Sequence, residues 1–274
     1  MDRAAQLALR WGAELTVVHA LEDEGLDLPE YRGLPPWRRP PDPVPLIERQ
    51  IRDEMPEPSP PTRIIVEEGP AVRVILDAAA REQADLIVLG LGRHRPFTGG
   101  LPRTIDELFR RSPVSVLVVK RRPHKPYQHL LVGTDFTPEA RRGLEVAGKL
   151  FPEAAMAVMH AYEMPYRSVM LNTQLGRDFG ELETSTLRNF LAEAELSDQQ
   201  RTRLFPLIEH GPPEVMLATY AMERGADLTV IGAYERSRLF HVVIVGKGPR
   251  IVDSVPTDVL VVRAEREADE RPAD

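Results

Sequence analysis

The sequence of 274 residues contains no cysteine, which excludes disulfide bonds, thiolate catalysis and cysteine metal sites. No apolar run approaches the length that spans a bilayer, and residues 1–5 are charged and lack the apolar core of a signal peptide. The formal net charge is −7, so the chain has no excess of cations with which to bind nucleic acid or anionic membranes. These absences predict a cytoplasmic protein that binds neither nucleic acid nor membranes.

Patterns of catalytic and metal-binding residues are also missing. The seven histidines show no helical pair beside a glutamate and no carboxylate cluster at ligand spacing, so no metal site is expected. His19 and His160 end equivalent strands and are interpreted as hydrogen-bonding residues. Asp135 with His160 would make an acid–base pair, but no serine, threonine or lysine is marked as their nucleophile. No catalytic residue is therefore assigned.

What the chain does contain is a short apolar run that ends in glycine and occurs twice. Residues 84–90, ADLIVLG, recur as residues 226–232, ADLTVIG. Each copy follows a helical pattern and is typical of a strand buried on both faces of a parallel sheet. Ligands of open α/β sheets lie at the carboxyl edge of the strands, so the loops after Gly90 and Gly232 are the expected ligand sites.

The repeat extends well beyond this run. His160 follows His19 by 141 residues, Gly232 follows Gly90 by 142, and Pro256 follows Pro113 by 143. Such a slow drift indicates two duplicated domains with small loop insertions. We predict a first domain at 1–121, a linker at 122–128, a second domain at 129–264 and a disordered tail at 265–274.

Alternating strand and helix patterns fill both halves. Strands are expected at 14–20, 63–67, 84–90, 113–119, 130–136, 155–161, 203–209, 226–232 and 258–262. Helices are expected at 2–11, 71–83, 103–111, 137–150, 181–195 and 213–224. Eleven prolines lie between Pro29 and Pro61, so this stretch is expected to be an extended loop around a helix at 44–55. The alternative is a partner-docking segment around Tyr31 and Trp37.

The first copy lacks a counterpart of the strand at 130–135. The offset of the repeat places that counterpart before residue 1. An empty position would deprive both neighbouring strands of backbone partners. Either the natural protein starts upstream of Met1, or another segment fills the position.

The element order resembles the universal stress protein domain, and two copies resemble the tandem universal stress proteins of bacteria. The strongest matches are His160-Ala161, residues 209–212, 226–232 and 256–262, and their first-half copies. The resemblance implies an α/β fold of two doubly wound parallel-sheet domains with strand order 3-2-1-4-5, the first lacking its opening central strand. It also implies a pseudo-dimer within the chain, joined through the last strands at 114–119 and 259–262. A homodimer is a further hypothesis.

ATP-binding members of this family carry an aspartate after the first strand and the loop Gly-x2-Gly-x9-Gly-Ser/Thr after the fourth. Glycines of this kind let backbone amides approach phosphates. In the second half Asp135 and Gly232 match, whereas Glu235 takes the second glycine position and Val245 the third. Residues 246–248, Gly-Lys-Gly, follow one position late. A carboxylate beside a triphosphate counts against ATP, and the lysine partly offsets it.

The first half departs further from this pattern, because it has no counterpart of the aspartate. Gly90 matches, Arg93 and Arg103 replace the later glycines, and Thr104 supplies the hydroxyl. The nucleotide-site residues that the resemblance implies are, in the second half, Thr134, Asp135, Phe136, Ala161, Gly232, Ala233, Gly246, Lys247 and Gly248, and, in the first half, Gly90, Gly92, Arg93, Arg103 and Thr104.

Three functional hypotheses remain open. The first is a non-catalytic stress protein that binds an adenine nucleotide such as ATP, with Mg²⁺ only if ATP binds. The second is a nucleotide-independent interaction scaffold whose loops have degenerated. The third is a slow ATPase.

Overall fold

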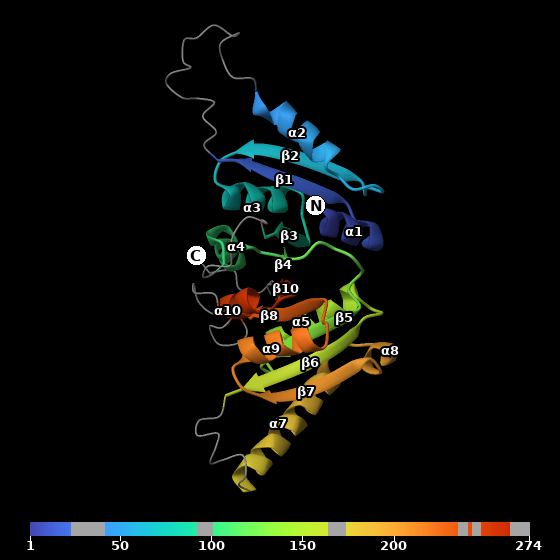
Figure 1. Ribbon diagram of the computed structural model, residues 1–274, viewed down its shortest axis with the longest axis vertical. Coiled ribbons are helices and arrows are strands. Elements are labelled where there is room, and N and C mark those ends of the chain that lie inside the picture. The colour runs from blue at the N-terminus through green and yellow to red at the C-terminus, as the bar shows by residue number, and fades with distance from the viewer. Residues whose placement is uncertain (23–41, 92–100, 164–173, 235–240, 243–247, 264–274) are drawn as a thin grey trace, which may run out of the picture. The chain divides into compact units, whose positions relative to one another are not determined.

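The computed structural model describes residues 1–22, 42–91, 101–163, 174–234, 241–242 and 248–263 (Figure 1). The chain divides into two compact units, Met1–Ile87 and Val88–Asp274. The expectations for Tyr31 and Trp37 and for the tail at 265–274 lie outside the described residues.

The described residues of the first unit form a parallel sheet of two strands with three helices. Its elements are α1 (Asp2–Trp11), β1 (Leu15–Leu21), α2 (Pro43–Asp53), β2 (Thr62–Glu68) and α3 (Ala71–Arg81). β1 and β2 pair in parallel, with Leu15 opposite Thr62. Figure 1 shows α2 on one side of this pair and α1 and α3 on the other. The predicted helix within the proline-rich stretch is α2, where the Asp42 side chain accepts a hydrogen bond from the amide of Val44 at 3.0 Å.

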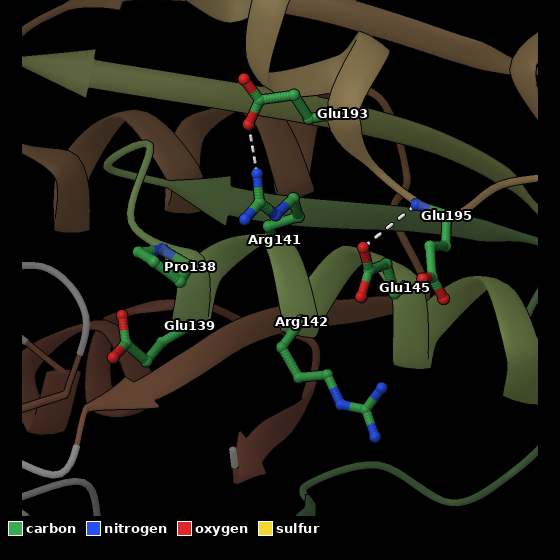
Figure 2. A pocket seen from close by; sticks show the side chains of 7 residues that line it. All are labelled: Pro138, Glu139, Arg141, Arg142, Glu145, Glu193 and Glu195. Carbon is green, nitrogen blue, oxygen red and sulfur yellow. Dashed lines mark hydrogen bonds and ion pairs between the residues drawn. The ribbon is translucent and has the colours of Figure 1, made fainter. Parts of the chain in front are cut away.

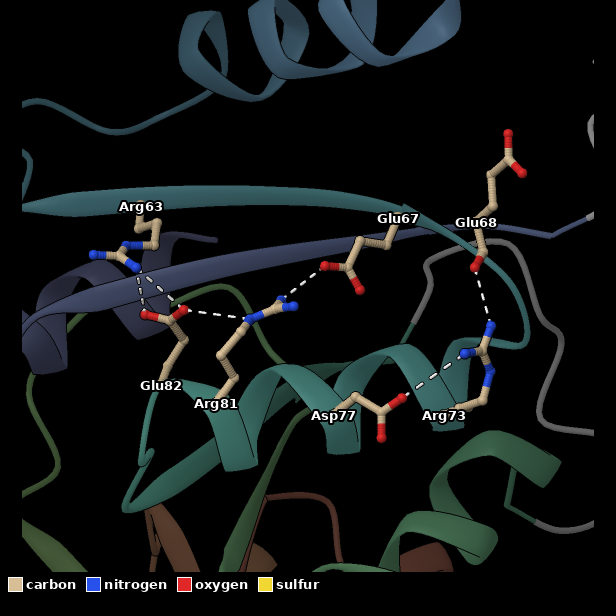
Figure 3. Close-up of polar contacts among 7 residues, drawn as sticks. All are labelled: Arg63, Glu67, Glu68, Arg73, Asp77, Arg81 and Glu82. Atoms are coloured by element: carbon tan, nitrogen blue, oxygen red, sulfur yellow. Dashed lines mark hydrogen bonds and ion pairs between the residues drawn. The ribbon is translucent and has the colours of Figure 1, made fainter.

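Ion pairs connect β2 to α3 in the first unit (Figure 3). Arg63 contacts Glu82 at 2.9 Å, and Arg81 contacts Glu67 at 2.8 Å. Arg73 donates to the carbonyl oxygen of Glu68 at 3.1 Å. Arg63 and Arg81 are exposed and Glu67 and Glu82 are half-buried, so each pair contributes only about 1 kcal/mol.

The second unit is built on an eight-stranded sheet, of which β3 begins at the end of the first unit. The strands are β3 (Leu86–Gly90), β4 (Ser115–Val119), β5 (His129–Thr134), β6 (Ala155–Tyr162), β7 (Leu204–His210), β8 (Leu228–Tyr234), β9 (His241–Val242) and β10 (Asp258–Arg263). Their order is β3-β4-β10-β8-β5-β6-β7, and β9 pairs with β8.

This order confirms the predicted fold of the second repeat. Its five strands in chain order are β5, β6, β7, β8 and β10, and they lie in the order 3-2-1-4-5. The expected pairing of the last strands is also present, since β4 and β10 pair antiparallel with Val118 opposite Val259. The side chains of Leu130, Leu131 and Val132 on β5 are fully buried, which places the core around this central strand.

Helices cover both faces of this sheet. They are α4 (Arg103–Arg111), α5 (Pro138–Leu150), α7 (Gln174–Glu193), α8 (Asp198–Arg201), α9 (Pro213–Glu223) and α10 (Gly248–Ser254). A Cβ added at Gly232 of β8 would contact α5. A Cβ added at Gly133 of β5 would instead contact Ile231, the residue before Gly232, and Leu217 of α9. Successive residues of a strand point to opposite faces, so α5 and α9 lie on opposite faces. The sequence predicted α7 only from residue 181.

The first repeat is divided between two sheets. By the repeat, β1, β2, β3 and β4 correspond to β6, β7, β8 and β10. β1 and β2 form the two-stranded sheet, while β3 and β4 belong to the eight-stranded sheet. No described residue forms a counterpart of β5, and the division falls where β5 lies in the second repeat. The first repeat therefore lacks its central strand within the described chain.

Two aspartates fix the segment that joins the repeats. Asp258, 1% exposed, accepts from the amide of Lys120 at 2.7 Å, from the amide of Arg121 at 3.1 Å and from the hydroxyl of Tyr127 at 2.5 Å. The Tyr127 ring is buried against Phe151, with ring centroids 5.4 Å apart. One buried carboxylate thus holds both ends of the segment.

Asp227, from the repeated run, holds the end of the same segment. It accepts from the amides of Gln128 and His129, each at 3.0 Å, and pairs with Lys125 at 2.8 Å. Burial alone would raise the pKa of Asp227, but the bonds from Lys125 and the two amides outweigh it and hold the pKa below its ordinary value. Asp227 therefore has a structural role in the second repeat.

The side chain of Lys120, whose amide bonds Asp258, makes further hydrogen bonds in this region. Its ammonium donates to the carbonyl oxygens of Val252 and Val255, at the end of α10, the second at 2.6 Å. Burial lowers the pKa of Lys120 to about 8, although the charges of Asp253 and Asp258 oppose the change. The lysine thus connects the residues just before the linker to α10.

Candidate functional site

The topology of the second repeat points to one edge of the sheet. The chain passes from β5 to β6 and β7 on one side and then returns to β8 on the other side of β5. Ligands of open α/β sheets bind outside the carboxyl ends of the strands at such a reversal. Thr134 ends β5, Asp135 follows it, and Gly232 and Ala233 lie near the end of β8. Ala161 lies near the end of β6.

Asp135 is a half-buried carboxylate at this edge. Its Oδ1 accepts from the amide of Thr137 at 3.2 Å and from the hydroxyl of Thr137 at 2.7 Å. Burial raises the pKa of Asp135, and the two bonds from Thr137 and the charge of His160 only partly oppose this rise. The Thr137 hydroxyl also accepts from the amide of Ala140 at 3.3 Å, as the predicted N-cap of α5.

His160 connects β5 to an aromatic cluster. Its Nδ1–H donates to the carbonyl oxygen of Thr134 at 2.8 Å, and its Nε2 lies 3.3 Å from the carboxylate of Glu183 on α7. The ring of Phe136 stacks on the imidazole with centroids 4.1 Å apart and planes inclined by 30°. Phe136 has a φ of 66°, the left-handed region that non-glycine residues rarely adopt. The backbone thus turns this ring onto His160.

The cluster continues across β6 and β7. The His160 ring stacks on Tyr162 with centroids 5.9 Å apart, and Tyr162 contacts His210 edge to face at 5.1 Å. Burial, and then the charge of Glu183, raise the pKa of the Tyr162 hydroxyl. Both ring nitrogens of His210 are buried without a hydrogen-bond partner among the described residues. The sequence analysis missed Tyr162, His210 and Glu183 as parts of this site, although Tyr162 and His210 end adjacent strands.

These features can be set beside known proteins. The universal stress protein family matches the sequence twice, over residues 1–120 and 126–263. The chain belongs to the universal stress protein family.

Solved structures support the fold of this tandem universal stress protein. A putative universal stress protein from Pseudomonas aeruginosa UCBPP-PA14 is 21% identical with a TM-score of 0.67, over 96% of this chain and 87% of that one. A universal stress protein from Archaeoglobus fulgidus DSM 4304 is 16% identical with a TM-score of 0.59, over 91% of this chain and 87% of that one. At these identities the likeness shows the fold alone. No curated protein sequence matched the chain.

In this universal stress protein Gly232 is not the start of a loop. β8 continues to Tyr234, and Ala233 pairs with Val242 of β9. A Cβ at Gly232 would lie 2.3 Å from the carbonyl oxygen of Glu139, and a Cβ at Gly143 would lie 3.3 Å from the amide nitrogen of Gly232. The two glycines let α5 approach β8 closely. Packing therefore requires Gly232, whether or not a phosphate binds nearby.

The remaining predicted residues are only partly described. Gly90 is exposed at the end of β3, with no described atom within 4 Å of a Cβ built there. Arg103 and Thr104 form the first turn of α4, where Arg103 is exposed and Thr104 half-buried. Gly248 begins α10. Gly92, Arg93, Gly246 and Lys247 lie outside the described residues.

A pocket that the sequence did not predict lies along α5 of the universal stress protein's second domain (Figure 2). It is lined by Pro138, Glu139, Arg141, Arg142, Glu145, Glu193 and Glu195. Arg141 pairs with Glu193, and Glu145 accepts from the amide of Glu195 at 3.0 Å. Four carboxylates against two guanidinium groups do not favour a polyanion here. The pocket contains none of the predicted nucleotide-site residues.

Two other kinds of feature are absent from the described part of the chain. No group of three or more histidines, aspartates and glutamates there is arranged to hold a metal ion. Among the same residues, no helix is long and apolar enough to cross a membrane.

The raised pKa of Asp135 predicts a pH-dependent effect of the substitution Asp135→Asn. A folded-state pKa above the ordinary value of 3.8 means that Asp135 stabilises the fold below that value and that this contribution is lost as the pH rises through the folded-state pKa. Asparagine keeps an oxygen for Thr137 without the charge. We expect the melting temperature of the variant, relative to the parent, to be higher at pH 7 than at pH 3.

The exposed Asp77, on α3, provides the control. Asp77→Asn should show no comparable change in relative melting temperature between the two pH values. A larger destabilisation by Asp135→Asn at pH 7 than at pH 3 would contradict the expected cause, since it would mean that the charged carboxylate stabilises the fold.

Proposed function

We propose that the second domain binds an adenine nucleotide at the carboxyl ends of β5, β6 and β8, without catalysing its conversion, and that this binding serves stress adaptation in the cytoplasm. The observation that carries the proposal is Asp135. It follows the central strand at the reversal of strand order, and burial disfavours its charged form. Perturbed carboxyl groups of this kind concentrate at functional sites.

The contacts around Asp135 suit a flat base with an exocyclic amine. Both bonds from Thr137 end on Oδ1, which leaves Oδ2 to accept from a ligand amine. The stacked rings of Phe136 and His160 offer an aromatic surface beside it. The remaining predicted residues, Ala161, Ala233 and the glycines with Lys247, would complete the site around the ribose and phosphates. Mg²⁺ would accompany ATP as the counter-ion of its phosphates.

Catalysis is not part of this proposal because the hydroxyl nearest Asp135 already has a structural task. Thr137 donates to Asp135 and accepts from Ala140, which uses its hydroxyl to cap α5. An activated nucleophile instead needs a base that takes its proton while the oxygen faces the substrate. Phosphate release from ATP that Asp135→Asn abolishes would instead establish the slow ATPase.

A second function is favoured by one specific observation. Gly232, the best match to the nucleotide loop, is needed for the close contact with α5. A glycine kept for packing would persist in a domain that no longer binds nucleotide. The second candidate is therefore a nucleotide-independent interaction scaffold.

Calorimetric titration of the full chain with ATP and Mg²⁺, and with AMP, separates these two functions. We expect saturable binding near one nucleotide per chain, which Asp135→Asn weakens by roughly tenfold or more because a charged hydrogen bond is lost. Asp77→Asn, on the exposed face of α3, should bind as the parent does. If neither nucleotide produces heat nor raises the melting temperature at millimolar concentration, nucleotide binding is wrong and the scaffold stands.

A further inference from the structure

The pocket along α5 is lined by an excess of negative charge (Figure 2). Its volume of about 460 Å³ is within the range of sites that bind small molecules. The lining contributes four carboxylates and two guanidinium groups, so two negative charges are in excess. One carboxylate is neutralised by the ion pair of Arg141 with Glu193. Three carboxylates then remain against one guanidinium group, and they belong to Glu139, Glu145 and Glu195.

Glu145 is the buried member of this set. It lies in the middle of α5 and is only 9% exposed. Its Oε1 accepts from the amide of Glu195 at 3.0 Å, and its Oε2 has no hydrogen-bond or ion-pair partner among the described residues. Removing a carboxylate from water is unfavourable unless a cation or several donors compensate for the lost hydration. Within the described chain, this carboxylate has one backbone amide as compensation.

The fold explains a hydrogen-bond acceptor at this position but not a charge. The side-chain oxygen of a glutamine would accept the same bond from the amide of Glu195. By the offset of 141, the corresponding residue of the first repeat is Ala4, so a helix of this fold does not need a carboxylate here. The helix dipole does not favour the charge either, because Glu145 lies beyond the first turn of α5. The charge of Glu145 therefore points to a cation from outside the chain.

A second carboxylate of the lining also has an oxygen without a partner. Oε2 of Glu139 is buried and has no hydrogen-bond partner among the described residues. Glu139 and Glu145 are separated by roughly 9 Å along the axis of α5, at the usual rise per residue. The unpaired carboxylates are thus spread along the pocket. A flexible ligand with two cationic groups suits such a spacing better than a single point charge does.

We propose that this pocket binds an aliphatic diamine or polyamine, with one ammonium group on Oε2 of Glu145 beside Glu195 and a second directed toward Glu139. Two ammonium groups match the two excess negative charges of the lining. A divalent metal ion carries the same charge but needs its ligands around one point. No group of three or more histidines, aspartates and glutamates in the described chain is arranged in that way.

Calorimetric titration of the nucleotide-free full chain with 1,5-diaminopentane tests the pocket, and 1-aminopentane is the matched monoamine. We expect one diamine per chain, bound at least about tenfold more tightly than the monoamine because its second ammonium group meets a second carboxylate. Several diamines per chain, or equal binding of both amines, would indicate diffuse attraction to a chain of net charge −7. Either result would overturn the proposal.

Two glutamine variants make the same change of charge at different places. Glu145→Gln keeps an acceptor for the amide of Glu195 and should weaken diamine binding by at least about tenfold. Glu181 is exposed on α7, roughly 18 Å along that helix from Glu193, and does not line the pocket. Glu181→Gln should therefore bind the diamine as the parent does. Equal weakening by both variants would contradict a defined site at Glu145.

Melting temperatures separate binding from folding. Without the amine, Glu145→Gln should melt no lower than the parent, because it removes a buried charge that no described cation pairs with. Millimolar 1,5-diaminopentane should raise the melting temperature of the parent and not that of Glu145→Gln. A variant that melts lower without the amine would show that the charge already serves the fold, against the proposal.

The diamine site and the proposed nucleotide site can be tested separately. Asp135 does not line this pocket, so Asp135→Asn should bind 1,5-diaminopentane as the parent does. Loss of diamine binding in Asp135→Asn would place the amine at the nucleotide site and overturn the assignment to Glu145.

Discussion

Gly232→Ala is expected to destabilise the protein severely. The new Cβ would lie 2.3 Å from the carbonyl oxygen of Glu139 and 2.9 Å from the amide of Ala140. These are backbone atoms of α5, so no side-chain rotation relieves the clash and the helix must move. We expect a loss of about 3 kcal/mol or more in the free energy of unfolding, equivalent to a fall of roughly 6–12 °C in melting temperature.

The equivalent glycine of the first repeat is the matched control. Gly90 has open space around the position of a Cβ among the described residues, so Gly90→Ala should change the free energy of unfolding by less than about 0.5 kcal/mol. Denaturant unfolding of both variants measures the difference. Equal stabilities would show that α5 does not approach β8 as closely as the structure has it, and Gly232 would again be open to a phosphate-binding role.

This contrast shows how far the sequence predicted the site. The repeated glycines end similar sequences, ADLIVLG and ADLTVIG, and both were expected to serve a nucleotide loop. They differ because the first turn of α5 lies against Gly232, whereas nothing described lies against Gly90. Such a contact depends on the packing of a helix distant in sequence, which periodicity does not encode.

The fold itself was largely predictable, because buried parallel strands and amphipathic helices alternate with strong periodicity. The order of the strands followed from the resemblance, and the structure confirms it in the second repeat. The extension of β8 to Tyr234 was missed because it depends on pairing with β9, a partner of only two residues. The stacking of Phe136 on His160 was missed because it requires an unusual backbone φ after β5.

The division of the first repeat connects the fold to the proposed function. The central strand before Asp135 in the second repeat has no counterpart among the described residues of the first. The nucleotide is accordingly proposed for the second domain.

Asp258→Ala is the other substitution with a large expected effect. It leaves the amides of Lys120 and Arg121 and the hydroxyl of Tyr127 without their acceptor at a position that is 1% exposed. Each buried unsatisfied donor costs about 1–3 kcal/mol, so we expect a total loss near 4 kcal/mol after relaxation. The start of the linker should also open, which exposes the bonds after Lys120 and Arg121 to trypsin more often.

Two matched variants separate the hydrogen bonds from the charge. Asp253→Ala removes another carboxylate whose charge acts on Lys120. The Asp253 side chain forms no hydrogen bond to a described residue, so this variant should lose less than about 0.5 kcal/mol in the free energy of unfolding. Tyr127→Phe removes only the hydroxyl bonded to Asp258 and should cost about 1–2 kcal/mol. Denaturant unfolding and the rate of tryptic cleavage in the linker should rank the variants in the same order, with Asp258→Ala the most affected. If Asp253→Ala proved as damaging as Asp258→Ala, charge near Lys120 would stabilise the linker, and the buried hydrogen bonds would not be its main support.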